Sequence, residues 1–155
     1  MLTAFLDYQR ATIEMKVDGI DDAQARTCVE PSDISLLGIV RHLTEVERNW
    51  FRNRFLAEDA PSYYRSESDT DGDWHAGPDD TLEDAVALYR GECERARAIV
   101  RDTSSLDDES KVRIWWKNDE PVTLRWILVH MIEETARHAG HADLLRERID
   151  GVTGE

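Results

Sequence analysis

The sequence lacks the features that mark disulfide-stabilised, membrane-spanning or secreted proteins. Its two cysteines, Cys28 and Cys93, are far apart and belong to no CxxC or Cys/His cluster. We therefore expect two free thiols, as in a reducing cytoplasm. No run approaches the roughly 20 apolar residues that span a bilayer. The N-terminus has no basic segment followed by a long apolar core, which argues against a secretory signal.

Basic residues are scarce. Nineteen Lys and Arg stand against 33 Asp and Glu, which gives a formal net charge of −14 over 155 residues. A nucleic-acid-binding protein needs a basic face that displaces counterions from phosphates. The deficit therefore excludes nucleic acid and anionic membranes as expected partners. With 41% hydrophobic residues, the composition favours one globular domain over residues 1–155. The cysteine pattern and the N-terminal sequence lead us to expect this domain in the cytoplasm.

Apolar residues recur at helical spacing almost throughout, and no run alternates with period two for long enough to predict a strand. Four helices are expected, over about 2–18, 35–57, 81–102 and 123–150. Candidate N-caps precede the last three, and Gly19 and Gly151 follow the first and the last. The pattern predicts an all-α fold, an antiparallel four-helix bundle with two long connecting loops. The second loop contains the sequence RIWW, which is expected to fold back onto the bundle.

Glu134 and His138 form the most informative pair. They lie four residues apart on the last helix and share a face that is otherwise apolar. A buried carboxylate without a partner costs several kcal/mol. His42 occupies an inward position on the second helix, so three polar groups point toward the core. A divalent metal ion would balance the charge of Glu134 and accept lone pairs from two neutral imidazoles.

Spacing alone leaves two interpretations of these residues open. Two histidines and one carboxylate suit zinc, nickel, ferrous iron or manganese, with a position left for water or substrate. Alternatively, Glu134 and His138 form an ion pair within their helix, and His42 is a hydrogen-bonded core histidine. His141, three residues after His138, is a candidate fourth ligand, proton shuttle or hydrogen-bond donor behind a ligand. The single ExxxH pattern excludes a dinuclear carboxylate centre.

The remaining aromatic residues and histidines carry weaker expectations. His130 lies on another side of its helix and is expected to be structural, while His75 in the acidic loop is expected to be solvated. Four tryptophans could line the mouth of a pocket, but packing in the core and loops is the favoured explanation for each of them. They are Trp50, Trp115, Trp116 and Trp126.

Two segments resemble a known family. SLLGIVRHLTEVERNWF and LRWILVHMIEETARHAGHADLLRERIDG are similar to the DinB-like superfamily, and more narrowly to its actinobacterial DUF664 branch. The similarity covers nearly the whole chain. It implies a four-helix bundle that holds one divalent metal, often zinc or nickel, with ligands at the positions of His42, Glu134 and His138. The His-Glu-His set resembles that of mycothiol-dependent maleylpyruvate isomerase.

The resemblance also implies a chemistry. Related enzymes are transferases and isomerases that use mycothiol, bacillithiol or glutathione, whose thiol is activated by the metal. We therefore expect a metal-dependent thiol S-transferase or isomerase that acts on a small-molecule thiol, such as mycothiol, and an electrophilic substrate. One alternative is a non-catalytic, metal-binding stress protein that forms a homodimer through its bundle faces. The other is a metal-dependent hydrolase that uses an activated water.

Most of the acidic excess is expected to lie in the connections and on outward helix faces, where it provides solubility and no chemistry. This group comprises Asp69, Asp71, Asp73, Asp79, Asp80, Asp107 and Asp108. Glu134 is the exception, because it interrupts an apolar stripe.

Overall fold

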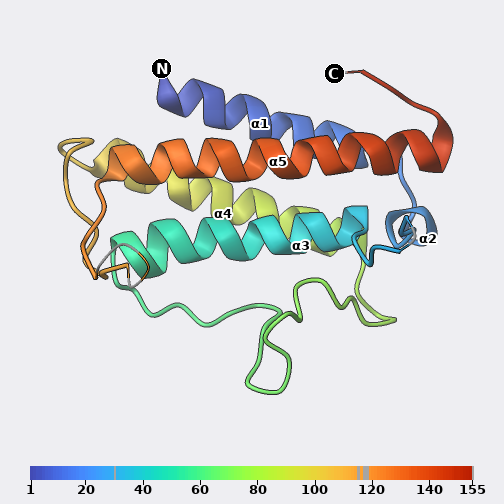
Figure 1. Ribbon diagram of the computed structural model, residues 1–155, viewed down its shortest axis with the longest axis horizontal. Helices are drawn as coiled ribbons and strands as arrows, with labels where there is room; N and C mark the ends of the chain where they lie inside the picture. The colour runs from blue at the N-terminus through green and yellow to red at the C-terminus, as the bar shows by residue number, and fades with distance from the viewer. Residues whose placement is uncertain (30, 115, 117–118, 155) are drawn as a thin grey trace.

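The computed structural model describes residues 1–29, 31–114, 116 and 119–154. Its long helices form a four-membered bundle, and a single-turn helix joins the first two members (Figure 1). The elements are α1 (Leu2–Val17), the short α2 (Asp22–Ala25), α3 (Leu36–Glu47) continued by the π-helix η1 (Arg48–Phe55), α4 (Leu82–Asp102) and α5 (Leu124–Asp150). The described residues contain no strand, so the predicted all-α four-helix bundle with two long loops is confirmed.

Side-chain caps fix where the helices begin. Ser35, Thr81 and Thr123 each accept a hydrogen bond from the backbone N–H three residues later, as expected for N-caps. Gly151 ends α5 in the left-handed conformation, with φ of 77°, and Gly19 follows α1 with φ of 72°. Both glycines adopt a conformation that other residues reach only at a cost.

The order of helix directions differs from the predicted antiparallel bundle. α3 and α4 run in the same direction, and α1 and α5 run in the other (Figure 1). Arg41 in α3 pairs with Asp80 just before α4, whereas Arg48 in η1 pairs with Glu92 in the middle of α4. Residues 56–81 make this possible, because parallel neighbours need a connection that returns along the full helix.

The second helical segment also differs from the expected continuous α-helix. Its last eight residues are π-helical, and the N–H of Leu56 donates to the carbonyl of Phe51, five residues back, at 3.3 Å. A π-turn holds more residues than an α-turn and so shifts which side chains face inward. Here Trp50, Phe51 and Phe55 all become buried.

Two apolar clusters fill the bundle, one at each end. The cluster beside the start of α3 includes Leu36, Leu37, Ile39, Tyr89 and Leu145. The cluster beside η1 includes Leu6, Phe51, Ile114, Ile127 and Met131. Ile114 comes from the RIWW segment, so the expected fold-back is confirmed for this residue, whereas Trp116 is half exposed. Trp115 lies outside the described residues.

A buried ion pair joins α1 to α3. The Arg10 guanidinium donates two hydrogen bonds to the Glu47 carboxylate, Nε to Oε1 at 2.7 Å and Nη2 to Oε2 at 2.6 Å. The two side chains are only 4% and 1% exposed. Removing both charges from water is costly, and the two parallel hydrogen bonds offset that cost only while both partners are present.

The two cysteines lie in different environments. Cys28 is exposed and Cys93 is buried, and neither is in a disulfide. Within the described residues, no helix is both long enough and apolar enough to cross a bilayer.

Candidate metal centre

α3 and α5 bring His42, Glu134 and His138 together in the middle of the bundle. Oε1 of Glu134 lies 3.3 Å from Nε2 of His42 and 3.5 Å from Nε2 of His138. One potential ligand atom from each residue lies within 4.8 Å of the others. The side chains are 14%, 14% and 8% exposed in the order of the sequence. The structure therefore brings together the three side chains that the sequence predicted as ligands.

Asp73 orients His42, and this corrects the prediction that Asp73 only provides solubility. Asp73 is fully buried, and its Oδ2 accepts a hydrogen bond from Nδ1 of His42 at 2.8 Å. With Nδ1 held as the donor, Nε2 is the nitrogen that faces Glu134 and His138, and it would offer its lone pair to a bound metal ion. A carboxylate behind a histidine is a common arrangement at metal sites, where it fixes the tautomer and ring orientation.

Two arginines hold the segment that carries Asp73. Arg65 donates from Nε to Oδ1 at 2.9 Å and from Nη2 to Oδ2 at 2.7 Å, so it grips the carboxylate with both branches. Arg41 donates to the backbone carbonyls of Asp73 and Gly72 at 3.2 and 2.7 Å. The acidic loop is thereby fixed against α3, and Asp73 is available to His42 in one orientation.

Trp74 covers the same histidine. Its indole stacks on the imidazole of His42, with ring centroids 4.5 Å apart and an interplanar angle of 23°. Gly38, one turn earlier on α3, allows this approach. A Cβ at position 38 would lie 3.2 Å from Cε3 of Trp74. The sequence interpretation missed Trp74, although a large aromatic residue in an acidic loop is itself a sign that the loop is anchored.

The charges in the site reinforce one another. Burial works against protonation of His42, but its hydrogen bonds to the Asp73 and Glu134 carboxylates outweigh burial and raise its pKa. Hydrogen bonds from His138 and His42 lower the pKa of Glu134 well below its usual value, despite burial. The site therefore presents a carboxylate that stays ionised, beside the imidazole of His42, whose positive charge a cation could replace.

His141 lies behind His138 and outside the group of three. Its Nδ1 is 3.4 Å from Nδ1 of His138, whereas His138 directs Nε2 toward Glu134. Burial and the neighbouring His138 lower the pKa of His141. Of the roles considered for His141, this geometry fits a hydrogen-bonding partner or proton acceptor better than a fourth ligand. Arg137 completes the surroundings by donating to Oε2 of Glu134 at 2.9 Å.

The other two histidines lie outside the group. His130 stacks on Trp126, with centroids 5.1 Å apart, and meets the edge of Trp50 at 4.5 Å. This aromatic cluster packs α5 against η1. His75 is 60% exposed and contacts Asp69 at 2.8 Å.

The acid sensitivity of the metal-free protein is expected to depend on Asp73. Burial disfavours the carboxylate, but His42 and Arg65 more than compensate, so the fold lowers the pKa of Asp73 below its ordinary 3.8. On acidification the unfolded chain is protonated at this residue first. The contribution to stability is therefore complete above about pH 5 and is lost as the pH falls through and below 3.8.

Urea unfolding in the presence of a chelator, at several pH values between about 6 and 3, measures this effect. We expect a smaller loss of stability on acidification in Asp73→Asn than in the wild type. Equal losses in the two proteins would contradict the assignment.

The donor set fits a divalent metal ion. Two imidazole nitrogens and one carboxylate oxygen suit zinc and related ions, and three protein ligands leave a position for another molecule. The buried hydrogen bond from His42 to Asp73 supplies the outer support that metal-binding histidines usually have.

The helix order and long crossover define a bundle of the DinB-like type. The family model for mycothiol-S-transferase, abbreviated MST, matches residues 1–151, so the chain belongs to that DinB-like family. A crystal structure described as a conserved protein from Enterococcus faecalis is similar in fold, with a TM-score of 0.72 over 97% of this chain and 96% of that one. Sequence identity is 15%. A search among curated proteins found no match.

Proposed function

We propose that this protein is a metal-dependent thiol S-transferase that uses a low-molecular-weight thiol, with mycothiol as the expected one. The observation that carries the proposal is the convergence of His42, Glu134 and His138 within 4.8 Å, in a chain of the mycothiol-S-transferase family. Zinc is the expected metal, because the ligand set is mixed nitrogen and oxygen and has an open position.

Each ligand has a defined part in this proposal. His42 and His138 would donate neutral nitrogens, and Glu134 would contribute one negative charge. A divalent metal held there lowers the pKa of a neighbouring thiol, which supplies thiolate at neutral pH. Asp73 keeps the ring of His42 in place, and Trp74 shields that ring from water.

His141 is the proposed acceptor of the thiol proton. Because its pKa is lowered, the imidazole is neutral near pH 7 and can take up a proton. The sulfur then forms a bond to an electrophilic carbon, and the leaving group departs with its electron pair. With monochlorobimane as the electrophile, the products are the thioether and chloride.

Metal analysis combined with a conjugation assay tests the proposal. We expect about one divalent ion per chain, and mycothiol-dependent conjugation of monochlorobimane. His42→Ala and His138→Ala should lose both, because each variant leaves two ligands. His75→Ala is the matched control, since His75 is an exposed histidine outside the group, and it should behave as the wild type.

Two results would overturn the proposal. One is metal-loaded protein that conjugates no low-molecular-weight thiol, which would favour the non-catalytic metal-binding alternative. The other is turnover of hydrolysable esters or amides without any thiol, which would favour the hydrolase.

A further inference from the structure

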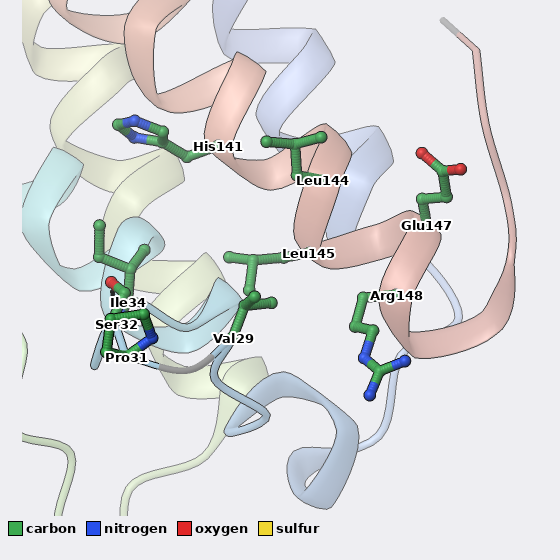
Figure 2. Close-up of a pocket in the computed structure, with 9 residues that line it drawn as sticks. All are labelled: Val29, Pro31, Ser32, Ile34, His141, Leu144, Leu145, Glu147 and Arg148. Atoms are coloured by element: carbon green, nitrogen blue, oxygen red, sulfur yellow. Dashed lines mark hydrogen bonds between the residues drawn. The ribbon is translucent and has the colours of Figure 1, made fainter.

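An open pocket of about 700 Å³ lies against α5 and is lined in part by His141 (Figure 2). Its volume is in the range of small-molecule sites. One wall is the segment that leads into α3, and the other is the C-terminal half of α5. Its lining residues include Val29, Pro31, Ile34, His141, Leu144 and Leu145.

His141 links the pocket to the proposed metal centre. His141 lines the pocket and also contacts His138 at 3.4 Å. Along α5, the pocket residues His141, Leu145 and Arg148 follow His138 at intervals of three or four residues. Such intervals place side chains on one helix face. A molecule in this pocket would therefore lie along the same stripe of α5 that carries Glu134 and His138.

The described lining of the pocket is mainly apolar and includes one cationic side chain. Arg148 belongs to the lining, at the opposite end from His141 (Figure 2). Among the described residues, Arg148 has no hydrogen-bonding or ion-pair partner, although most arginines in this acidic chain are paired. Glu147 also belongs to the lining, but its carboxylate points away from Val29 and Pro31 (Figure 2).

We propose that this pocket binds the electrophilic substrate, an apolar organic molecule that carries an acidic group directed toward Arg148. The identity of the occupant as the electrophile rests on the proposed function. The apolar walls favour it over a polar thiol, whose hydroxyl and amide groups would lose hydrogen bonds to water there. The reactive carbon would face His141, and the acidic group would lie at the far end of the pocket.

A matched pair of fluorescent probes tests the binding without metal, thiol or turnover. 1-Anilinonaphthalene-8-sulfonate carries an acidic group, and N-phenyl-1-naphthylamine is the same aromatic body without it. Both should bind the wild type. Arg148→Gln should weaken the sulfonate probe by about two- to fivefold, as for an exposed ion pair, and leave the neutral probe unchanged.

Leu144→Glu tests the apolar wall. Leu144 is 67% exposed, so the substitution leaves the core intact. It should weaken both probes by about tenfold or more, since an apolar contact is replaced by a charge. Arg54→Gln is the control for net charge, because Arg54 lies in η1, at the opposite end of the bundle (Figure 1).

Unchanged binding in Leu144→Glu, or equal weakening by Arg148→Gln and Arg54→Gln, would overturn the proposal. So would a change from dimer to monomer in Leu144→Glu by sedimentation, because the groove would then belong to a subunit interface. A different result would reject the proposed function without rejecting the pocket. Probe binding that follows these expectations, in a protein without thiol conjugation, would retain the pocket and reject the transferase.

Discussion

Replacing Asp73 with asparagine is expected to weaken metal binding by about 10- to 100-fold, the usual cost of losing a carboxylate behind a histidine ligand. Asp73 makes no contact with the proposed metal. It acts through the 2.8 Å hydrogen bond to Nδ1 of His42. An amide at this position can present its nitrogen to the ring, which would favour the wrong tautomer, and it carries no charge to stabilise the liganded imidazole.

Competition with a chromophoric chelator measures the dissociation constant directly. Asp71→Asn is the matched control, because it removes the same charge from the same loop at an exposed position. Circular dichroism of Asp73→Asn should show the wild-type helix content, so that a loss of affinity reports on the site. Equal metal affinities in the two variants would remove Asp73 from the proposed centre.

Glu47→Ala is expected to lower the free energy of unfolding by about 3–5 kcal/mol, because it leaves a buried arginine without its partner. Arg10 has a raised pKa beside Glu47, despite burial, and therefore remains charged. Urea unfolding of the metal-free protein measures the loss. Glu14→Ala is the control, since it breaks a more exposed pair between α1, which also carries Arg10, and Arg90 of α4, and it should cost less than about 1 kcal/mol.

The double variant Arg10→Met, Glu47→Leu separates the charge from the packing. It removes both ions together, so we expect it to be more stable than Glu47→Ala alone, although it carries more substitutions. A double variant as unstable as Glu47→Ala would show that shape complementarity, rather than the unpaired charge, explains the cost.

Local signals in the sequence predicted the helices well. Ser35, Thr81 and Thr123 locate helix starts because capping depends on one side chain and the backbone three residues away. The π-helical turn of η1 was missed, because the sequence has the same apolar spacing as an α-helix. The direction of α4 was also missed, since periodicity identifies a helix without saying which way it runs.

In the candidate site, too, the sequence predicted the residues that local spacing identifies and missed the one that depends on the tertiary fold. Glu134 and His138 could be paired from their spacing on one helix, and His42 joined them through its inward position and the family resemblance. Asp73 could not be distinguished from Asp69 and Asp71 in an acidic loop. Its role depends on the tertiary fold, which buries it under Arg65 and beside His42.

The two hydrogen bonds of His42 have a consequence for the order of events during folding. They reach partners 31 and 92 positions away in the sequence. In zinc fingers the ligands lie close together, and the ion drives a short chain to fold. Here the chain must close long loops before a complete set of donors exists. Metal uptake would therefore follow folding, and an ion bound afterwards would stabilise a structure that the apolar core and buried ion pairs had already formed.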